Sequence, residues 1–509
     1  MSQSFYLTTP LYYVNDRPHI GSAYTTLIAE MIAMYHRMKD DDVFFLTGTD
    51  EHGQKVQQAA EKNGISPKEH CDLYATRFQE LWSYFNLSND DFIRTTEDRH
   101  VKVVKHVLQD LFDKGEIYKD KHEGWYSVAD ELFITEKDYE EGKYRDVRRI
   151  SETNYYFKMG AYQDRLIKYI NDNPNFIQPE NRKNEILGFL KQPLKDLCIS
   201  RPKERLSWGI ELPFDKDYVT YVWFDALLNY VTAPGYLQDD ERFQKTWPAV
   251  HLIGKDILTT HCVYWPTMLM AAGISLPKTV FAHGWWTSEG QKMSKSLGNF
   301  IDLETIQMHC DNVGKDAYRY YMAKEGPLFS DSDFSKERFY QTYNTDLAND
   351  FGNLVNRIFK LIKKYYDGKV PIPGELGEDE KSMANAAEGC RELVMKDLDK
   401  LNVNAIASDV ISYVTSINRY LEKTEPWKLA KTDLEATKTV LYTALASLRF
   451  SASLLYPLLP EKMTEFFSML NSGDTPGSLM KWEDLKSGIE LGEMKALFPR
   501  FDMKLLETM

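Results

Sequence analysis

The chain has 509 residues, enough for about three or four domains, and its 43% hydrophobic and 27% charged residues are typical of a globular protein rather than a disordered one. No uninterrupted apolar stretch is long enough to span a membrane, and residues 1–9 lack the basic and apolar parts of a secretory signal. The net charge of −14 argues mildly against nucleic acid as a partner, although a large acidic protein can carry a local basic strip.

The cysteines indicate the compartment. The five of them are far apart and none forms a CxxC pair: Cys71, Cys198, Cys262, Cys310 and Cys390. This spacing argues against a disulfide framework and against a zinc site built from cysteines, so we expect a protein of the reducing cytoplasm.

The first segment reads as strand, loop, helix and strand. Residues 5–9 form an apolar run that leads into a loop ending at Gly21, residues 22–38 carry apolar side chains at helical spacing, and residues 43–47 form a second apolar run before Gly48. This order predicts a βαβ unit with parallel strands and a right-handed crossover.

A similar pattern returns after a long polar, tyrosine-rich block. Strands are expected at 250–253 and 279–282, with a helix at 257–272 that Pro266 is expected to kink. Two such halves predict a doubly wound, nucleotide-binding sheet whose ligands bind at the carboxyl ends of the strands, near the point where strand order reverses.

The remaining third of the chain reads as all-helical, with amphipathic stretches at 347–366, 378–398, 403–421 and 434–454. The predicted fold class is therefore α/β, a split Rossmann-type parallel sheet with an inserted connective domain, followed by an all-α bundle. The expected boundaries are 1–116 and 213–325 for the two halves of the sheet domain, 117–212 for the insertion, 326–345 for a connector and 346–509 for the bundle.

Two short motifs lie at strand ends of this sheet. In the first, His19-Ile20-Gly21 opens a helix, where free N–H groups and the positive end of the dipole suit a phosphate; a lone match of this kind is more often a solvated histidine. In the second, Lys292 and Lys295 lie in the loop Lys292-Met293-Ser294-Lys295-Ser296 and have the charge to neutralise a triphosphate; two lysines alone are more often a solvated loop.

Together the two motifs resemble the signature of the class I aminoacyl-tRNA synthetases, and the sheet argument places both at one crevice. Longer blocks resemble methionyl-tRNA synthetases over nearly the whole chain: Pro10-Leu11-Tyr12-Tyr13, Gly48-Thr49-Asp50-Glu51-His52-Gly53, Tyr221-Val222-Trp223-Phe224-Asp225-Ala226, Ile253-Gly254-Lys255-Asp256 and His283-Gly284-Trp285-Trp286-Thr287. The resemblance implies a methionine–tRNA ligase that activates L-methionine with ATP to methionyl-adenylate and transfers it to the 3′-terminal adenosine of tRNA(Met), initiator tRNA included.

The family pattern also implies residue roles. His19, Lys292 and Lys295 would be catalytic, and the ATP-binding set would be His19, Gly21, Ser22, Asp256, Lys292, Ser294 and Lys295. Ser22 replaces a histidine that often closes the first motif and retains a hydrogen-bond donor. For Asp256 a turn-capping role is an equal alternative. ATP would enter with Mg²⁺.

The methionine pocket implied by the family combines one carboxylate with an apolar and aromatic wall. Asp50 would hold the ammonium group. Aromatic edges favour a polarisable thioether, although core packing is the default for Trp223 and Tyr230 without the family match. The full set is Leu11, Tyr13, Asp50, Trp223, Ala226, Tyr230 and His283.

In the bundle, Asn353 and Arg357 share a helix face and Trp427 offers a stacking surface, which matches the family's anticodon readers. Nearby lysines (Lys360, Lys363, Lys364 and Lys369) either meet RNA phosphates or form an ordinary solvated face.

The sequence also departs from family patterns. Many members hold zinc in the insertion through cysteines, but Ser127 stands where a cysteine often does and only Cys198 lies in 117–212, so we expect no structural zinc. We expect a monomer that does not bind membranes. The alternatives are another class I synthetase, a non-catalytic tRNA-binding paralogue and a small-molecule adenylyltransferase.

Overall fold

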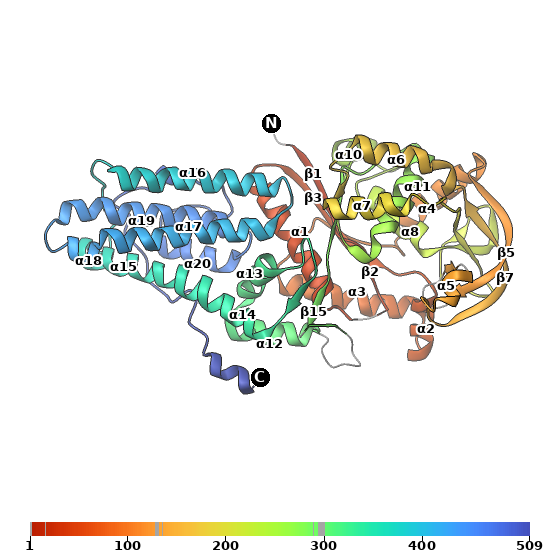
Figure 1. The fold of residues 1–509 in the computed structure, drawn as a ribbon, viewed down its shortest axis with the longest axis horizontal. Coiled ribbons are helices and arrows are strands. Elements are labelled where there is room, and N and C mark those ends of the chain that lie inside the picture. The colour runs from red at the N-terminus through yellow and green to blue at the C-terminus, as the bar shows by residue number, and fades with distance from the viewer. Residues whose placement is uncertain are drawn as a thin grey trace.

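The computed structural model describes residues 3–15, 17–127, 132–134, 136–288, 290–293 and 301–508. Two lobes lie side by side along the long axis (Figure 1): a sheet-containing lobe with the N-terminal half of the chain, and a bundle of long helices formed by the C-terminal part. Within the described residues, no helix is both long and apolar enough to cross a membrane.

A parallel sheet forms the centre of the first lobe. Its order is β2 (Tyr12–Tyr13), β3 (Asp42–Asp50), β1 (Ser4–Thr8), β13 (Val250–Gly254), β14 (Thr279–His283) and β8 (Ile177–Gln178), with β4 (Asp91–Arg94) also pairing with β3. Strand order reverses between β1 and β13, which pair through Leu7–Val250 and Thr8–His251. The predicted fold class is confirmed.

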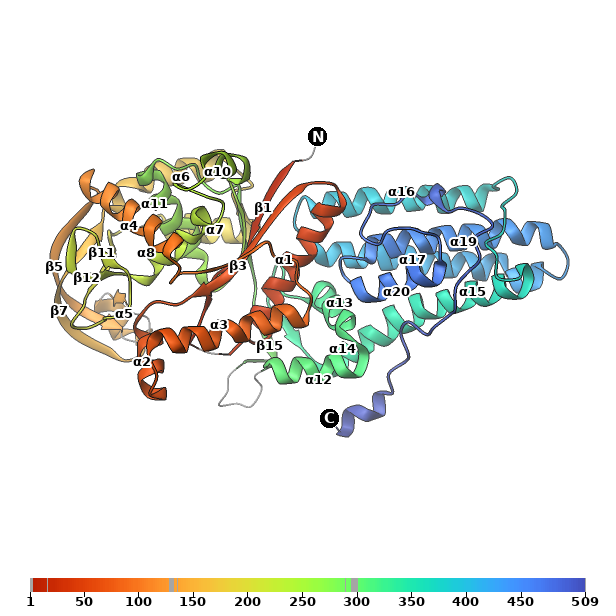
Figure 2. The same ribbon diagram turned by 180° about the vertical axis from the view of Figure 1, so that it is seen from behind.

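Helices surround this sheet. α1 (Ile20–Met38) is buried along nearly its whole length because it lies between the sheet and the helical lobe (Figure 2). The others in this lobe are α2 (Gln54–Asn63), α3 (Pro67–Tyr84), α4 (Asp98–Asp113), α6 (Gln163–Asp172), α7 (Glu180–Phe189), α8 (Val222–Leu227), α9 (Asn229–Thr232), α10 (Asp240–Thr246) and α11 (Trp265–Ala272). The irregularity expected at Pro266 comes earlier, as a π-helical turn at Thr260–Tyr264, and Pro266 lies in the first turn of α11.

The block 117–212 is built on a long antiparallel pair, β5 (Ile117–Ser127) and β7 (Val147–Phe157), which β6 (Leu132–Ile134) and β9 (Leu197–Cys198) extend. Short strands follow at β10 (Ser200–Pro202), β11 (Glu211–Leu212) and β12 (Asp215–Thr220), and α5 spans Glu136–Glu140. The block also supplies β8, which pairs with β14, so part of it belongs to the main sheet.

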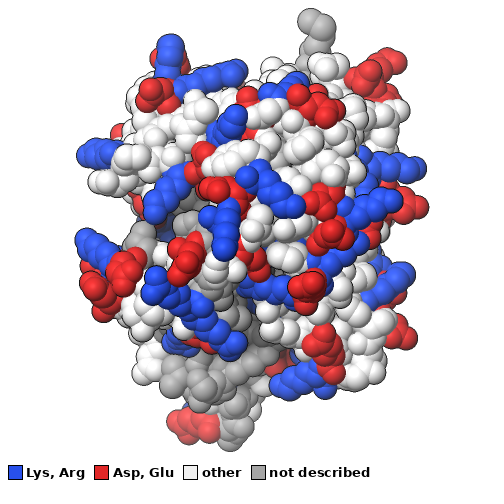
Figure 3. All heavy atoms as spheres, turned by 90° about the vertical axis from the view of Figure 1, so that its right-hand side faces the viewer, with Lys and Arg blue, Asp and Glu red and all other residues white. Residues whose placement is uncertain are grey.

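Near the end of this hairpin, aromatic and cationic side chains pack together. Trp125 stacks on Tyr139 with ring centroids 3.8 Å apart, and the guanidinium of Arg205 lies 4.2 Å from the centre of the buried Tyr126 ring. The end of the molecule that faces the viewer in Figure 3 carries basic and acidic side chains interspersed. The surface there is of mixed charge, without a continuous basic field.

Beyond β14, a small sheet of β15 (Trp286–Ser288), β16 (Gln291–Lys292) and β17 (Ser332–Phe334) leads to α12 (Leu303–Val313) and α13 (Lys315–Glu325). Residues 336–366 are then helical without a break, as α14 (Lys336–Thr342), a π-helical stretch (Tyr343–Gly352) and α15 (Asn353–Tyr366). The bundle is completed by α16 (Glu378–Leu398), α17 (Val403–Thr424), α18 (Pro426–Leu429), α19 (Leu434–Leu455) and α20 (Pro460–Leu470).

The two lobes share one hydrophobic core, which runs from Phe5 and α1 through α13 into α17 and α19. Polar bonds cross the same boundary: the Tyr35 hydroxyl donates to the carbonyl of Leu454 at 2.8 Å, and the buried Arg319 guanidinium donates to the carbonyl of Pro457 at 2.8 Å. The position of the bundle relative to the sheet is therefore fixed by side-chain packing.

Candidate active site

A cavity of about 880 Å³ opens at the carboxyl ends of the strands, at the switch point between β1 and β13. Its volume is in the range of small-molecule sites. All predicted ligand-binding residues of the sheet lobe whose side chains are described line it: Leu11, Tyr13, His19, Gly21, Ser22, Asp50, Trp223, Ala226, Tyr230, Asp256 and His283. Residues from five separate parts of the sequence therefore meet at one place.

His19 begins helix α1 at this cavity. Its Nδ1 accepts from the backbone N–H of Gly21 at 3.0 Å, and its own backbone N–H donates to Ser22 Oγ at 3.0 Å, so the two residues cap the helix reciprocally. Because Nδ1 is an acceptor, the neutral imidazole carries its proton on Nε2. That proton and the start of the helix dipole give this edge of the cavity donors for an anion.

The segment with the second motif adjoins His19. Ser294 and Lys295 lie outside the described residues, and for Lys292 only the backbone, in β16, is described. The flanking residues are close: Met293 lines the cavity, the backbone N–H of Ile20 donates to the carbonyl of Ile301 at 3.0 Å, and His19 forms a β-bridge with Asp302. The described residues on either side of 294–300 therefore lie at the cavity, at Met293, and against the start of α1, at Ile301 and Asp302.

Asp50 ends strand β3 at the cavity and is only 6% exposed. Tyr13 pairs with it in the neighbouring strand β2. The next turn requires glycine at position 53, because φ is +109° there and a Cβ would lie 2.6 Å from the Tyr13 hydroxyl. The strand end thus holds a buried carboxylate between an aromatic ring and a tight turn.

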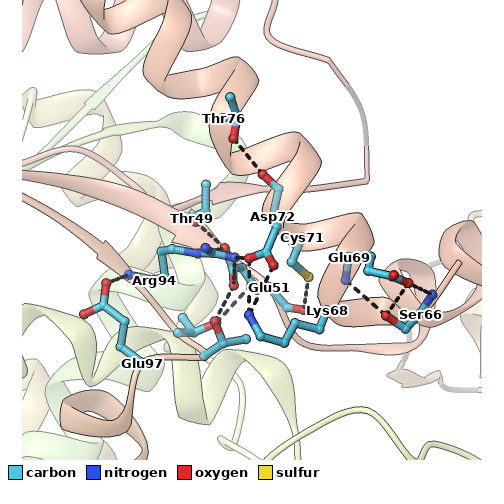
Figure 4. Close-up of polar contacts among 12 residues, drawn as sticks. Thr49, Glu51, Ser66, Lys68, Glu69, Cys71, Asp72, Thr76, Arg94 and Glu97 are labelled. Atoms are coloured by element: carbon cyan, nitrogen blue, oxygen red, sulfur yellow. Dashed lines mark hydrogen bonds and ion pairs between the residues drawn. The ribbon is translucent and has the colours of Figure 1, made fainter.

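The residue after Asp50 is held by an ion-pair network (Figure 4). The fully buried Glu51 carboxylate accepts from Arg94 Nε at 2.6 Å, from Thr49 Oγ1 at 2.8 Å and from Thr96 Oγ1 at 2.5 Å. Arg94 also donates to Asp72 at 2.6 Å, which joins helix α3 to the network. Although burial opposes it, the pairing with Glu51 raises the pKa of Arg94. Glu51 thereby anchors the backbone that presents Asp50.

Arg94→Ala is expected to lower the free energy of unfolding by about 3 kcal/mol, because it leaves the buried Glu51 carboxylate without its counter-charge. Urea unfolding measures this loss. Arg99→Ala is the matched control: its partners Asp91 and Glu97 are 19% and 32% exposed, so about 1 kcal/mol or less is expected. Equal losses in the two variants would contradict the anchoring role of Glu51.

The opposite wall of the cavity comes from α8 and α9. Trp223 and Ala226 lie on α8, and the Tyr230 hydroxyl, on α9, is 2.9 Å from His261 Nε2. His261 Nδ1 is 3.0 Å from the carbonyl of Ile257 and donates to it, so Nε2 accepts the Tyr230 proton. Burial lowers the pKa of His261 to about 4, which keeps the ring neutral. The Tyr230 side chain is therefore oriented by a neutral histidine.

Strand ends β13 and β14 close the cavity. His283 Nε2 lies 2.7 Å from Thr25 Oγ1 and its Nδ1 lies 2.7 Å from the carbonyl of Gly284, while burial lowers its pKa. Asp256 accepts from the indole Nε1 of Trp285 at 3.1 Å. His283 thus packs as a neutral ring, and Asp256 is a hydrogen-bonded carboxylate at the rim rather than a turn cap alone.

Among the cavity-lining side chains that the sequence reasoning missed, three have a buried polar atom without a partner among the described residues. Asn229 Oδ1, the Tyr24 hydroxyl and Trp286 Nε1 are buried and have no hydrogen-bond partner among the described residues. Trp286 lies within a motif quoted above and the other two lie a few residues beyond one, but polar side chains of this kind carry no local signature of ligand contact. In the structure their unpaired polar atoms indicate groups available to a ligand.

A second, polar pocket of about 600 Å³ lies on the helical lobe. Asn353 and Arg357, from α15, line it, and Asn418 from α17 accepts from Arg357 Nη1 at 3.4 Å. The Arg357 guanidinium lies 5.4 Å from the centre of the Trp427 ring. The three predicted anticodon-binding residues are thus brought together, and Lys360, which continues their helix face, also lines the pocket.

Two family models match consecutive parts of the chain: "tRNA synthetases class I (M)" over residues 5–148 and 141–359, and "Anticodon binding domain of methionyl tRNA ligase" over residues 370–501. The methionine–tRNA ligase of Bacillus subtilis is 44% identical, over 98% of this chain and 78% of that protein. The corresponding enzyme of Caldanaerobacter subterraneus is 43% identical, over 99% and 80%.

The chain belongs to the methionyl-tRNA synthetase family. Solved structures agree: the Mycobacterium tuberculosis methionyl-tRNA synthetase in complex with methionyl-adenylate is 37% identical, with a TM-score of 0.93 over 98% of this chain and all of that one. The free-state form of that synthetase gives a TM-score of 0.86 over 99% of both chains. This member of the family is an aminoacyl-tRNA ligase that activates methionine and charges tRNA with it, as its sequence predicts.

Some family members hold zinc in the insertion. Among the residues that the structure describes, no group of three or more histidine, cysteine or acidic side chains is arranged to hold a metal ion. Cys198 accepts from Arg201 Nη1 at 3.3 Å, and Ser127 Oγ donates to the carbonyl of Arg145 at 3.1 Å. In this synthetase these two positions are therefore used for hydrogen bonding within the insertion.

Proposed function

We propose that the cavity at the β1/β13 switch point binds methionine and ATP side by side and forms methionyl-adenylate there. The observation that carries this proposal is the convergence of the eleven predicted residues on one cavity, with His19 at one edge and Asp50 at another. The similarity of the whole backbone to a relative solved with methionyl-adenylate also supports the proposal.

For methionine, we assign the ammonium group to the Asp50 carboxylate and the side chain to the wall opposite. Leu11, Tyr13, Trp223, Ala226, Tyr230 and His283 would surround the thioether. Neutral aromatic and imidazole groups suit a polarisable sulfur and an unbranched chain, whereas a β-branched competitor would be excluded by shape.

For ATP, we assign the phosphates to the start of α1. The Nε2–H of His19 would donate to a phosphate oxygen at the positive end of the α1 dipole, where Gly21 and Ser22 also line the cavity. Lys292 and Lys295, with Ser294 between them, would neutralise the charge that develops during transfer. Asp256 would lie near the ribose or adenine. The nucleotide would enter as its Mg²⁺ complex.

The reaction then needs no protein nucleophile. A methionine carboxylate oxygen forms a bond to the α-phosphorus of ATP while the bond to the bridging oxygen breaks, which releases pyrophosphate and leaves methionyl-adenylate. The 2′-hydroxyl of the terminal tRNA adenosine next attacks the adenylate carbonyl, AMP leaves, and the hydroxyl proton is lost. Catalysis consists of positioning and charge stabilisation.

For tRNA(Met), elongator and initiator alike, we assign anticodon reading to Asn353, Arg357 and Trp427. Residues 326–345 would contact the stem of the tRNA, between the domains proposed at 213–325 and 346–509. The five free cysteines fit a cytoplasmic enzyme, and we propose that it acts as a monomer.

Trp427→Ala is expected to raise KM for tRNA about tenfold to a hundredfold in aminoacylation, because stacking of one unpaired base contributes about 1–3 kcal/mol. ATP–pyrophosphate exchange without tRNA serves as the internal control and should keep its wild-type rate. A parallel loss in exchange would mean that the substitution disturbs the whole enzyme, and an unchanged KM would remove Trp427 from the anticodon site.

The proposal is tested by ATP–pyrophosphate exchange with methionine, leucine, isoleucine, valine and cysteine, followed by charging of tRNA(Met) transcripts. At equal amino-acid concentrations, we expect the rate of exchange with methionine to be higher than the rate with any of the other four amino acids. Preference for a different amino acid would reject the methionine pocket, and exchange without charging would reject the assignment of the second pocket.

A further inference from the structure

A buried carboxylate outside the cavity joins two histidines from distant parts of the chain. Asp225 Oδ2 is 2.8 Å from His52 Nδ1, and Asp225 Oδ1 is 3.0 Å from His100 Nε2. Asp225 and His100 are fully buried and His52 is 5% exposed. None of the three lines the cavity or belongs to the groups assigned to substrates above.

Hydrogen-bond chemistry determines how the three side chains are joined. A carboxylate only accepts, so each facing imidazole nitrogen must carry its proton. Burial by itself would disfavour the charged carboxyl, but the coulombic effect of His52 and the hydrogen bonds from both rings lower the pKa of Asp225. His100 is held in turn by Thr232, whose Oγ1 is 3.4 Å from its Nδ1. The Asp225 carboxylate thus accepts from both rings, which join it to the strand end at His52 and to helix α4 at His100.

The cluster connects the two walls of the cavity. His52 follows Asp50 by two residues, at the strand end that Glu51 anchors from the other side. Asp225 lies on α8 between Trp223 and Ala226, which form the opposite wall. The His52–Asp225 bond therefore spans 173 positions of sequence and links the backbone that presents the ammonium-binding carboxylate to the helix that surrounds the side chain.

We propose that Asp225 is a positioning residue that sets the distance between the ammonium site and the side-chain wall, and thereby the length of amino-acid side chain that the enzyme accepts. The inference rests on the proposed function, since it requires Asp50 to hold the ammonium group. It adds a specificity determinant that touches no substrate. When the ammonium end of a linear substrate is fixed, the position of the wall formed by α8 limits the length of its side chain. We call the His52–Asp225 bond the tether; a weaker tether would let this wall shift and would admit longer side chains.

The test compares variants that keep or break the tether. Asp225→Asn removes the negative charge that both imidazoles contact, and the ring facing the amide N–H must change tautomer to keep its bond, so the link is weakened. His52→Ala removes the strand-side bond, whereas His52→Asn places an amide N–H near the position of Nδ1 and retains it. Asp316→Asn is the matched control, because Asp316 is also a buried aspartate (2% exposed) but lies where α13 meets the start of α20.

We expect Asp225→Asn and His52→Ala to raise KM for methionine in pyrophosphate exchange about tenfold or more, with KM for ATP within about twofold of wild type. Both variants should also lower the ratio of kcat/KM for methionine to kcat/KM for ethionine, whose side chain is one methylene longer. His52→Asn and Asp316→Asn should stay near wild type in both measurements. If Asp225→Asn does not fold, the comparison of His52→Ala with His52→Asn decides the question.

An unchanged KM for methionine and an unchanged ethionine preference in His52→Ala would overturn the proposal, as would equal rises in KM for methionine and ATP. Asp50→Asn, measured in parallel, separates this failure from that of the proposed function. If Asp50→Asn leaves KM for methionine unchanged, the ammonium site itself is misassigned. If Asp50→Asn raises it and the tether variants do not, only the tether is rejected.

Discussion

Asp50→Ala is expected to reduce kcat/KM for methionine in pyrophosphate exchange by about 10²–10³-fold. Asp50 is 6% exposed, at a strand end of the cavity. A substrate ammonium that enters there loses its hydration, and truncating one partner of a buried, hydrogen-bonded charge pair costs about 2–5 kcal/mol. The loss should fall mainly on KM for methionine, because the ammonium group is held equally in the ground state and in the transition state.

The control is a methionine analogue without the amino group, 4-(methylthio)butanoate, used as a competitive inhibitor. Wild type should bind this acid more weakly than methionine, and Asp50→Ala should bind the two similarly, because the carboxylate that distinguishes them is gone. A variant that still prefers methionine by the wild-type ratio would show that another group recognises the ammonium. KM for ATP should change little, since the predicted phosphate site is at His19.

Lys295→Ala is expected to reduce kcat of pyrophosphate exchange by about 10²–10³-fold, the typical cost of removing one donor that stabilises transition-state charge. The residues that precede and follow 294–300 are at this site: Met293 lines the cavity, and the carbonyl of Ile301 accepts from the N–H of Ile20. KM for methionine should stay close to wild type, because the charge in question builds up on the phosphates only during transfer. Stopped-flow measurement of adenylate formation isolates this step.

Lys278→Ala, at an exposed lysine before β14, is the matched control and should leave kcat and KM of pyrophosphate exchange at their wild-type values. A double-mutant cycle with His19→Ala tests whether both residues act on one triphosphate: their combined loss should then be smaller than the product of the single losses. Strictly multiplicative losses would argue for two independent sites.

Much of the fold was predictable because its signals are local. Apolar runs separated by a helical pattern indicated the two βαβ halves, and motifs at strand ends indicated one crevice, which the cavity around His19, Asp50 and His283 matches. The family resemblance supplied the residue roles, which neither spacing nor composition contains. Those roles remain predictions until the variants above are measured.

The features that the sequence did not reveal depend on contacts between distant residues. In its local sequence Asp225 is a single acidic residue in an apolar helix, and only the fold brings it into contact with His52 and His100. The pairing of β8 with β14 is equally non-local. The π-helical stretch at Tyr343–Gly352 was not predicted either, whereas the π-helical turn at Thr260–Tyr264 lies just before Pro266, where an irregularity was expected.

The unbroken helical run of residues 336–366 has a mechanical consequence. At about 1.5 Å per residue it spans about 45 Å, and it carries Arg357 at its far part while its near end is embedded in the core shared with the sheet. No flexible linker interrupts this strut. With anticodon reading assigned to Arg357, this helical run would hold the anticodon site at a fixed distance from the proposed adenylate site, so a tRNA would be selected partly by the spacing between its anticodon and its 3′ end.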